Sequence, residues 1–384
     1  MGRTAKIAAL ALASILTSFA SSNVRADEGK PSEIRIAYPG VGVGNRPFVG
    51  GNSMSVVHLK GMLEEEFRQD GIKVSWSFLR GAGPATNELY ANGLVDFSLL
   101  GDLPSIAGRA GGLKTRLLAA TGIRGNTYLA VPADSPIQSI KDLRGKKVAI
   151  FKGTNTQLAV AKLLEANGMT EKDIRALNMD QATSQAALTT KDVDAVFGGN
   201  NLLASRDQGV SRIVYATKGD PRFLRQASFV GAEDFIKKYP SVTKRVVKVL
   251  VQAAKWISDQ EKTPNAVYQL WTKSGVRYSD WREDFKEQNL KQLSSPLLDT
   301  YFVTQYESQV LQAKKYGLIR NTFDVKSWIE PRFLNEVLKE LNLQSYWAPA
   351  DKDGRVSALP AGAAADQRSA ALAPAAPAPA PASP

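Results

Sequence analysis

A strand–helix–strand pattern occurs twice in this chain and restricts the folds open to it. In the first copy, an alternating stretch at 74–79 leads through a glycine break into a helical stretch at 84–91 and an apolar stretch at 95–100. The stretches at 174–178, 182–189 and 193–197 repeat the same order. Short β-rich runs alternating with helical runs favour α/β units around mostly parallel sheets. We therefore expect an α/β protein with two similar halves.

Each copy ends its second predicted strand in a glycine-containing loop. These loops are Gly101-Asp102 in the first copy and Gly198-Gly199-Asn200 in the second. In open α/β sheets, ligands bind beyond the carboxyl ends of the strands. The repeat therefore predicts two lobes whose strand-end loops face each other across a cleft.

Both ends of the chain are predicted to lie outside the fold. Arg3 and Lys6 precede an apolar run at 7–16, and small residues follow before Asp27, which is typical of a cleaved signal peptide over 1–26. The alternative is a membrane anchor, but the run is shorter than the roughly 20 residues that span a bilayer. At the other end, 351–384 is rich in Ala and Pro and is predicted to be a disordered tail. We expect an exported, periplasmic protein.

The composition removes several kinds of chemistry. The chain has no cysteine and one histidine, which excludes thiol nucleophiles, iron–sulfur clusters, cysteine zinc sites and the usual histidine metal clusters. We expect no cofactor and no metal. The formal charge is +12, or +9 without the signal peptide. This excess either favours anionic ligands through a long-range field or reflects solvated helix faces, such as that of 237–255. Nucleic acid is a poor partner for an exported protein.

Two extended stretches suggest how the lobes connect. They lie at 127–132 and 212–216 and are predicted to form the paired crossovers of a hinge. Beyond 235 the chain is mostly helical, with one of the predicted helices at 281–293. We expect lobe 1 to comprise 27–129 and 216–350, and lobe 2 to comprise 130–215.

Three sequence segments near the start of the second lobe resemble a known family. They are Asp-Ser-Pro-Ile at 134–137, Asp-Leu-Arg-Gly-Lys-Lys-Val-Ala at 142–149 and Lys-Gly-Thr-Asn at 152–155. They resemble the nitrate, sulfonate and taurine branch of periplasmic binding proteins, which is sometimes grouped with the thiamine-pyrimidine binding proteins. The resemblance covers roughly residues 33–345. It implies a type II periplasmic binding protein fold with two α/β lobes, a hinge and a cleft.

The resemblance also implies a function. A monomeric binding protein of this family captures a small anionic solute, such as an aliphatic sulfonate, taurine or nitrate, without catalysis. Its partners are then an ABC permease and ATPase at the inner membrane. Two loops depart from the family pattern, namely the long glycine-rich loop at 41–54 and the segment at 198–201. An enzyme on the same fold, of the pyrimidine or menaquinone pathway type, and a periplasmic ligand sensor remain alternatives.

The candidate ligand-binding residues lie in strand-end loops and at one helix start. Thr154 or Asn155 is suited to cap a helix at 157–166 while leaving amide groups free for an anion. The alternative is ordinary capping, and for the glycines it is turn chemistry. The full set is Arg46, Gly81, Ala82, Gly101, Asp102, Ser105, Thr121, Lys152, Gly153, Thr154, Asn155, Thr156, Asn200 and Asn201.

Other conspicuous residues are interpreted as structural. The glycines at 40–44 lack the spacing of a nucleotide-binding fingerprint, although Phe48 in the same loop is a possible apolar wall of the cleft. His58 lies in a helix with an apolar face, where a lone histidine is more often structural than catalytic. The tryptophans of the helical C-terminal half are expected to fill the core rather than to stack on a ligand. They are Trp256, Trp271, Trp281 and Trp328.

Overall fold

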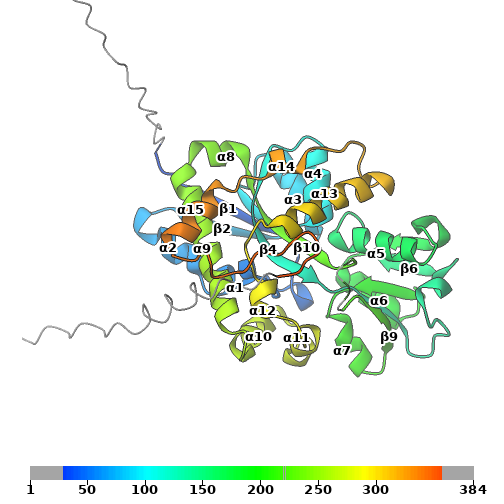
Figure 1. Cartoon of the computed structure of the whole chain (residues 1–384). Coiled ribbons are helices and arrows are strands. Elements are labelled where there is room, and N and C mark those ends of the chain that lie inside the picture. Colours follow the sequence, from blue (N-terminus) through cyan, green and yellow to red (C-terminus); the bar gives the residue numbers. More distant parts are fainter. Residues whose placement is uncertain (1–28, 219, 221, 357–384) are drawn as a thin grey trace, which may run out of the picture.

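The computed structural model describes residues 29–218, 220 and 222–356. The predicted signal peptide at 1–26 lies outside these residues, as does most of the predicted tail at 351–384. No helix of the described part combines the length and the apolar character needed to cross a membrane. The described elements form two lobes, each built around one five-stranded sheet (Figure 1).

The first sheet, that of lobe 1, takes its strands from two distant parts of the chain. Its strand order is β2-β1-β3-β10-β4. The strands are β1 (Glu33–Tyr38), β2 (Lys73–Phe78), β3 (Phe97–Gly101), β4 (Thr115–Gly125) and β10 (Arg225–Ala232). Because β3 lies inside the sheet, each of its residues is buried.

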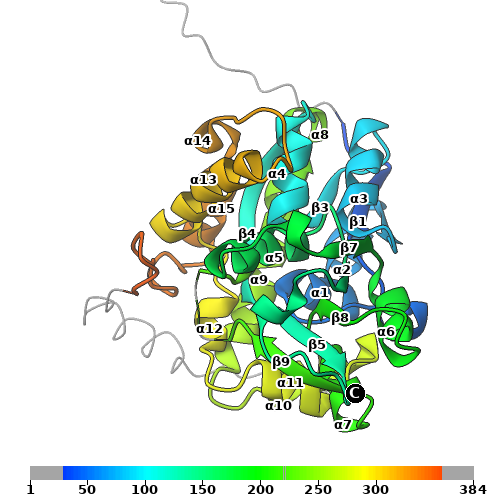
Figure 2. The ribbon, with the colours of Figure 1, turned by 90° about the vertical axis from the view of Figure 1, so that its right-hand side faces the viewer.

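The second sheet, that of lobe 2, is built from one continuous part of the chain. Its strand order is β7-β6-β8-β5-β9. The strands are β5 (Tyr128–Pro132), β6 (Lys147–Ile150), β7 (Arg175–Asn178), β8 (Ala195–Gly198) and β9 (Ser211–Ala216). Figure 2 looks from the side of lobe 2, with β5, β9 and α6 towards the viewer.

The repeat seen in the sequence is confirmed. Its copies form β2, α3 and β3 in lobe 1 and β7, α6 and β8 in lobe 2, and the two sheets share one strand order. The expectation of mostly parallel sheets is confirmed, with one antiparallel strand in each sheet. β10 runs antiparallel to both its neighbours, and so does β5. Each of these two strands enters its sheet directly from the other lobe, without the helical crossover that a parallel connection needs.

Twelve helices are described in lobe 1. They are α1 (Ser53–Leu59), α2 (Met62–Phe67), α3 (Ala82–Ala91), α4 (Asp102–Ala110), α8 (Glu233–Lys238), α9 (Pro240–Asp259), α10 (Asn265–Trp271), α11 (Tyr278–Asp284), α12 (Leu290–Leu293), α13 (Thr300–Lys315), α14 (Val325–Trp328) and α15 (Arg332–Glu340). The prediction of a single helix over 281–293 is wrong. The helical conformation is interrupted between α11 and α12, where Glu287 has a φ of 65°.

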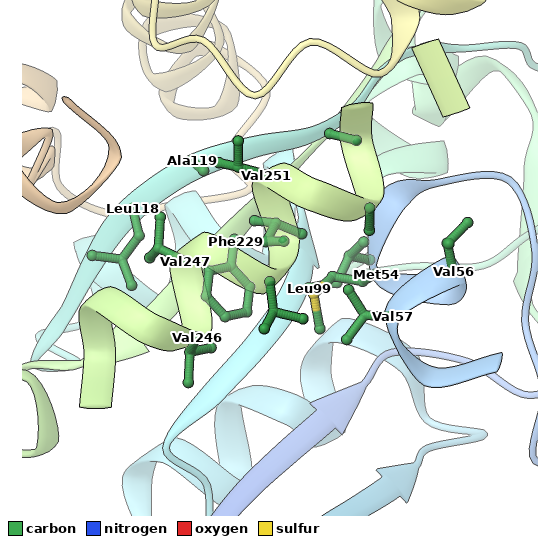
Figure 3. Close-up of a cluster of buried hydrophobic side chains, with 14 of the residues drawn as sticks. Met54, Val56, Val57, Leu99, Leu118, Ala119, Phe229, Val246, Val247 and Val251 are labelled. Atoms are coloured by element: carbon green, nitrogen blue, oxygen red, sulfur yellow. The ribbon is translucent and has the colours of Figure 1, made fainter. Parts of the chain in front are cut away.

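Helix α9 forms the centre of the lobe 1 core. It begins at Pro240, whose fixed φ suits the first helical position. Its apolar residues recur at helical spacing, so that one face carries Val246, Val247 and Val251 towards Phe229 of β10 (Figure 3). Burying this face against the sheet holds the strand ends of lobe 1 in place.

Lobe 2 has its own smaller core and three described helices. The helices are α5 (Asn155–Ala166), α6 (Gln181–Thr189) and α7 (Leu202–Asp207). Val160 and Leu164 of α5 pack on Val148 and Phe197 of the sheet. The predicted hinge stretches lie side by side as β5 and β9, with Leu129 opposite Tyr215. The chain passes between the sheets at 126–127 and 217–224, and the exact lobe boundaries stay a prediction.

Candidate functional site

A cavity of about 440 Å³ lies between the lobes. Lobe 1 lines it with residues at the carboxyl ends of β1 and β3, including Tyr38 and Gly101. Lobe 2 lines it with the segments after β6 and β8, including Phe151 and 198–201. The repeated strand–helix–strand unit therefore places its strand-end loops on the two sides of one cavity.

The lobes touch each other around this cavity. A Cβ atom added to Gly101 would lie 3.1 Å from Asn155 of lobe 2. One added to Gly153 of lobe 2 would lie 2.7 Å from Cγ of Pro84 in lobe 1. At the rim, Arg80 Nη2 lies 3.1 Å from Asp180 Oδ2 across the lobes. The structure therefore shows the lobes in contact, with glycines where the two backbones approach.

Arg225 is the principal cationic group of the cavity. It stands at the first position of β10, next to the passage between the lobes. Its Nη1 lies 3.4 Å from Thr156 Oγ1, and its Nη2 donates to the backbone carbonyl of Asn126. Its Nε atom is buried without a partner, and no carboxylate of the described residues forms an ion pair with it. A buried donor without a partner is uncommon in proteins and indicates a group that an absent molecule would satisfy.

A buried network fixes the residues behind Arg225. Asn126 Nδ2 donates to Asp284 Oδ1 at 2.8 Å, and the hydroxyl of Tyr128 donates to the same oxygen at 2.7 Å. Because Asp284 accepts both bonds, the amide of Asn126 has a fixed orientation, and its Oδ1 atom is left without a partner. Burial raises the pKa of Asp284, and the bonds from Asn126 and Tyr128 oppose this rise.

The charged residues of the lining balance in number, so the surroundings of each decide which ligand charge is favoured. The charged lining residues are Arg80, Asp180, Arg225 and Asp284. Arg80 and Asp180 pair with each other. Burial lowers the pKa of Arg225, while Asp284 and Asp102 raise it. Asp284 is already hydrogen-bonded and burial disfavours its charge. Arg225 is therefore the buried charged group of the lining that a ligand of opposite charge would stabilise.

The structure brings half of the predicted ligand-binding residues to the cavity wall. They are Ala82, Gly101, Thr154, Asn155, Thr156, Asn200 and Asn201. Parts of the glycine-rich loop also line the cavity, at 40–45 and 49–52. That these residues contact a ligand stays a prediction.

Other predicted residues lie behind the wall rather than on it. Asp102 is buried and accepts hydrogen bonds from the backbone N–H groups of Leu103 and Gln226. The Ser105 hydroxyl donates to the backbone carbonyl of Asp102 at 2.8 Å. Thr121 is fully buried, and its hydroxyl has no partner. The turn after β3 thus uses its polar groups internally, as helix caps do.

The remaining predicted residues face elsewhere. Gly81 precedes α3 and does not line the cavity, although Ala82 does. Arg46 is exposed and lies beside Gly275. Phe48 is also outside the lining, where its ring packs 5.7 Å from that of His58.

Two of the amide groups in the segment before α5 are in use. The N–H of Lys152 donates to Asn178 Oδ1 at 3.0 Å, and the N–H of Gly153 donates to Gln157 Oε1 at 2.7 Å. Lys152 pairs with Glu171 at 2.6 Å. Neither Lys152 nor Gly153 lines the cavity, which leaves Thr154, Asn155 and Thr156 as the part of this segment that does.

The sequence analysis missed Arg225, Asn126 and the double role of Trp281. Arg225 begins an otherwise uncharged strand, and this isolated charge is the signal that could have identified it. Trp281 belongs to the lobe 1 core, as predicted, but also lines the cavity. Trp256, Trp271 and Trp328 do not line it. No group of three or more metal-ligating side chains is placed to hold a metal within the described residues.

Comparison with known proteins identifies the family. A model of the NMT1/THI5-like family matches residues 67–263, which is more than half of the chain. The chain belongs to this family. The type II periplasmic binding protein fold and the resemblance found in the sequence are thereby confirmed.

Several proteins similar to this chain are named for sulfonates. A candidate periplasmic sulfonate-binding protein, SsuA, from Methylobacillus flagellatus KT has 33% identity and a TM-score of 0.71, with 83% of this chain and 97% of that chain covered. A candidate aliphatic sulfonates-binding protein from Bacillus subtilis (strain 168) is 26% identical over 292 residues, which are 73% of this chain and 83% of that protein. The desulfurization enzyme DSZB shares the fold at 19% identity and a TM-score of 0.59, covering 80% of this chain and 99% of that chain.

Proposed function

We propose that this protein is the periplasmic solute-binding component of an ABC importer, and that it binds a small organic anion between its lobes. One observation carries the proposal: Arg225, whose buried Nε atom has no partner among the described residues, lines a cavity between the two lobes. In such a place a charge-assisted hydrogen bond is stronger than in water. The partners are an ABC permease and ATPase at the inner membrane.

A sulfonate suits this site best. Its oxygens accept hydrogen bonds, and the lining residues with donor groups include Arg225 of lobe 1 and the asparagines at 155, 200 and 201 of lobe 2. The relatives named for sulfonates support this choice. Taurine and nitrate have the same acceptor chemistry and serve as comparison ligands.

Binding without turnover is the simpler role for this cavity. The chain has no cysteine, and its only histidine, His58, does not line the cavity. The fold alone does not exclude an enzyme, since DSZB shares it. Among the groups on the wall, none pairs a nucleophile with a histidine base, which is the arrangement that activates a hydroxyl or thiol nucleophile.

Capture follows from closure of the two lobes. The solute binds to one open lobe, and contacts from the second lobe then favour the closed arrangement. Arg225 is well placed for this coupling because it contacts Asn126 in the passage between the lobes and Thr156 of lobe 2. A solute bound to Arg225 therefore contacts both lobes.

Calorimetric titration of the R225Q variant tests the proposal. Loss of a charge-assisted hydrogen bond of about 1.5–3 kcal/mol should raise the Kd for a bound sulfonate by about tenfold to more than a hundredfold. The matched control is R80Q, which removes a cavity-lining arginine that is already paired with Asp180. We expect a smaller effect from R80Q. Equal Kd values for R225Q and the wild type, or failure of every anion to bind the wild type, would refute the proposal.

A further inference from the structure

The cavity is larger than a small inorganic anion requires. Cavities of about 300–1,000 Å³ hold organic ligands of substantial size, and this one has about 440 Å³. A nitrate ion at Arg225 would leave most of that volume to water. Other groups of the wall must therefore recognise the rest of a ligand, an inference that rests on the proposed function.

Aromatic side chains reach the cavity from both lobes. Lobe 1 contributes Tyr38, Trp281 and Phe285, and lobe 2 contributes Phe151 and Phe197. Aromatic rings favour offset or edge-to-face contact with other rings, beyond the area they bury. Closure of the lobes brings these rings around a single volume. A flat apolar body would fill that volume with ring contacts on both of its sides.

Trp281 is the most specific part of this wall. It is 6% exposed, and its Nε1 atom is buried without a partner among the described residues. An indole N–H can only donate a hydrogen bond, so a partner for this atom must be an acceptor. Trp281 thus lines the cavity with a large apolar ring, and its buried indole N–H has no partner among the described residues.

The glycine-rich loop after β1 holds the Trp281 ring in place. A Cβ atom on Gly50 would lie 2.6 Å from Cζ2 of Trp281, and one on Gly51 would lie 3.2 Å from its Cζ3. Gly51 also has a φ of 90°, a backbone conformation that other residues rarely adopt. The loop can therefore lie flat against the indole only because both residues are glycine. This close packing fixes one wall of the cavity.

We propose that the solute is an organic anion with an aromatic body, such as an aryl sulfonate, and that Trp281 determines this specificity. Arg225 binds the anionic group. The rings of the two lobes, with Trp281 as the fixed member, enclose the aromatic body. Trp271 is also buried with an unpartnered Nε1 atom, so the feature that sets Trp281 apart is its place in the cavity wall.

Titration with matched ligands tests this specificity. The probes are benzenesulfonate, cyclohexanesulfonate and methanesulfonate, which share the charged group and differ in the body. We expect benzenesulfonate to bind at least about tenfold more tightly than methanesulfonate, and more tightly than cyclohexanesulfonate. Equal binding of benzenesulfonate and cyclohexanesulfonate, or tighter binding of methanesulfonate, would overturn the inference while leaving the anion site intact.

Variants of Trp281 provide the second arm. W281L should weaken benzenesulfonate by about three- to tenfold and change methanesulfonate little, whereas W281F keeps a ring and should retain most of the preference. W256L is the matched control, because Trp256 lies outside the cavity and contacts Lys60. If W281L fails to fold, the affinities of the three sulfonates for W281F and for the wild type still test the inference. Equal weakening of all three probes by W281L overturns the role of Trp281, whereas failure of R225Q to weaken any of them overturns the proposed function instead.

Discussion

Replacement of Gly153 by alanine should weaken ligand binding through a contact that exists only when the lobes are closed. Gly153 has a φ of 74°, so a Cβ atom there costs roughly 1–2 kcal/mol of stability in any state of the protein. The same Cβ atom would lie 2.7 Å from Cγ of Pro84 on the other lobe. A proline ring on a helix cannot turn aside, so the closed state must shift to relieve the clash.

A second glycine allows the cost of the backbone conformation to be separated from the cost of the clash with Pro84. Gly168, at the far end of α5, has a φ of 68° and no atom within 4 Å of an added Cβ. G168A should therefore lose the same roughly 1–2 kcal/mol of unfolding free energy and keep the wild-type Kd. G153A should lose a similar amount and in addition bind benzenesulfonate about 5- to 100-fold more weakly, since overpacking of this kind costs about 1–3 kcal/mol.

Two measurements decide the outcome. Urea unfolding without ligand gives the stability of each variant, and calorimetric titration with benzenesulfonate gives the Kd. If G153A binds as tightly as G168A, then Gly153 and Pro84 do not meet in the ligand-bound state. That result would refute the closed arrangement described here, whatever the identity of the natural solute.

Two further predictions concern groups away from the ligand. Burial raises the pKa of Asp102 to about 6, above the value near 4 expected in the unfolded chain. The folded state therefore binds this proton more strongly, so the contribution of Asp102 to stability is largest below pH 4 and is lost as the pH rises through 6. The unfolding free energy of the wild type relative to D102N should fall by about 2 kcal/mol from pH 4 to pH 7, and a flat difference would contradict this. Glu165 of α5 contacts Lys315 and Tyr316 of lobe 1, but this contact is exposed. E165Q should raise the Kd by at most about fivefold, because exposed ion pairs contribute about 0–1 kcal/mol, and a larger loss in titration would show that this contact controls closure.

The elements that were predictable from the sequence are those set by local pattern. The strand–helix–strand repeat was recognisable because alternation and helical spacing depend on near neighbours. Its strand-end loops then followed from a general rule for α/β sheets, and residues such as Gly101 and Asn155 lie at the cavity as that rule requires. The same rule does not distinguish wall residues from those one layer behind, such as Asp102 and Ser105, whose polar groups are used within lobe 1.

The residues that were missed are placed by contacts between distant segments. Arg225 reaches the cavity because β10 inserts antiparallel between β3 and β4, and local sequence does not encode that insertion. Trp281 resembles the core tryptophans in its surroundings along the chain. Its place on the wall, beside Gly50 and Gly51 from a distant part of the sequence, is visible only in the folded structure.

The position of β10 has a consequence for how the protein reaches its folded state. Since β10 separates β3 from β4, with Ala227 opposite both Gly101 and Gly122, the first sheet stays in two pieces until the chain beyond 225 is available. All strands of the second sheet lie within 128–216 and can pair without waiting. We expect the inserted lobe to acquire its structure first, and the lobe that carries both ends of the chain to assemble around it afterwards.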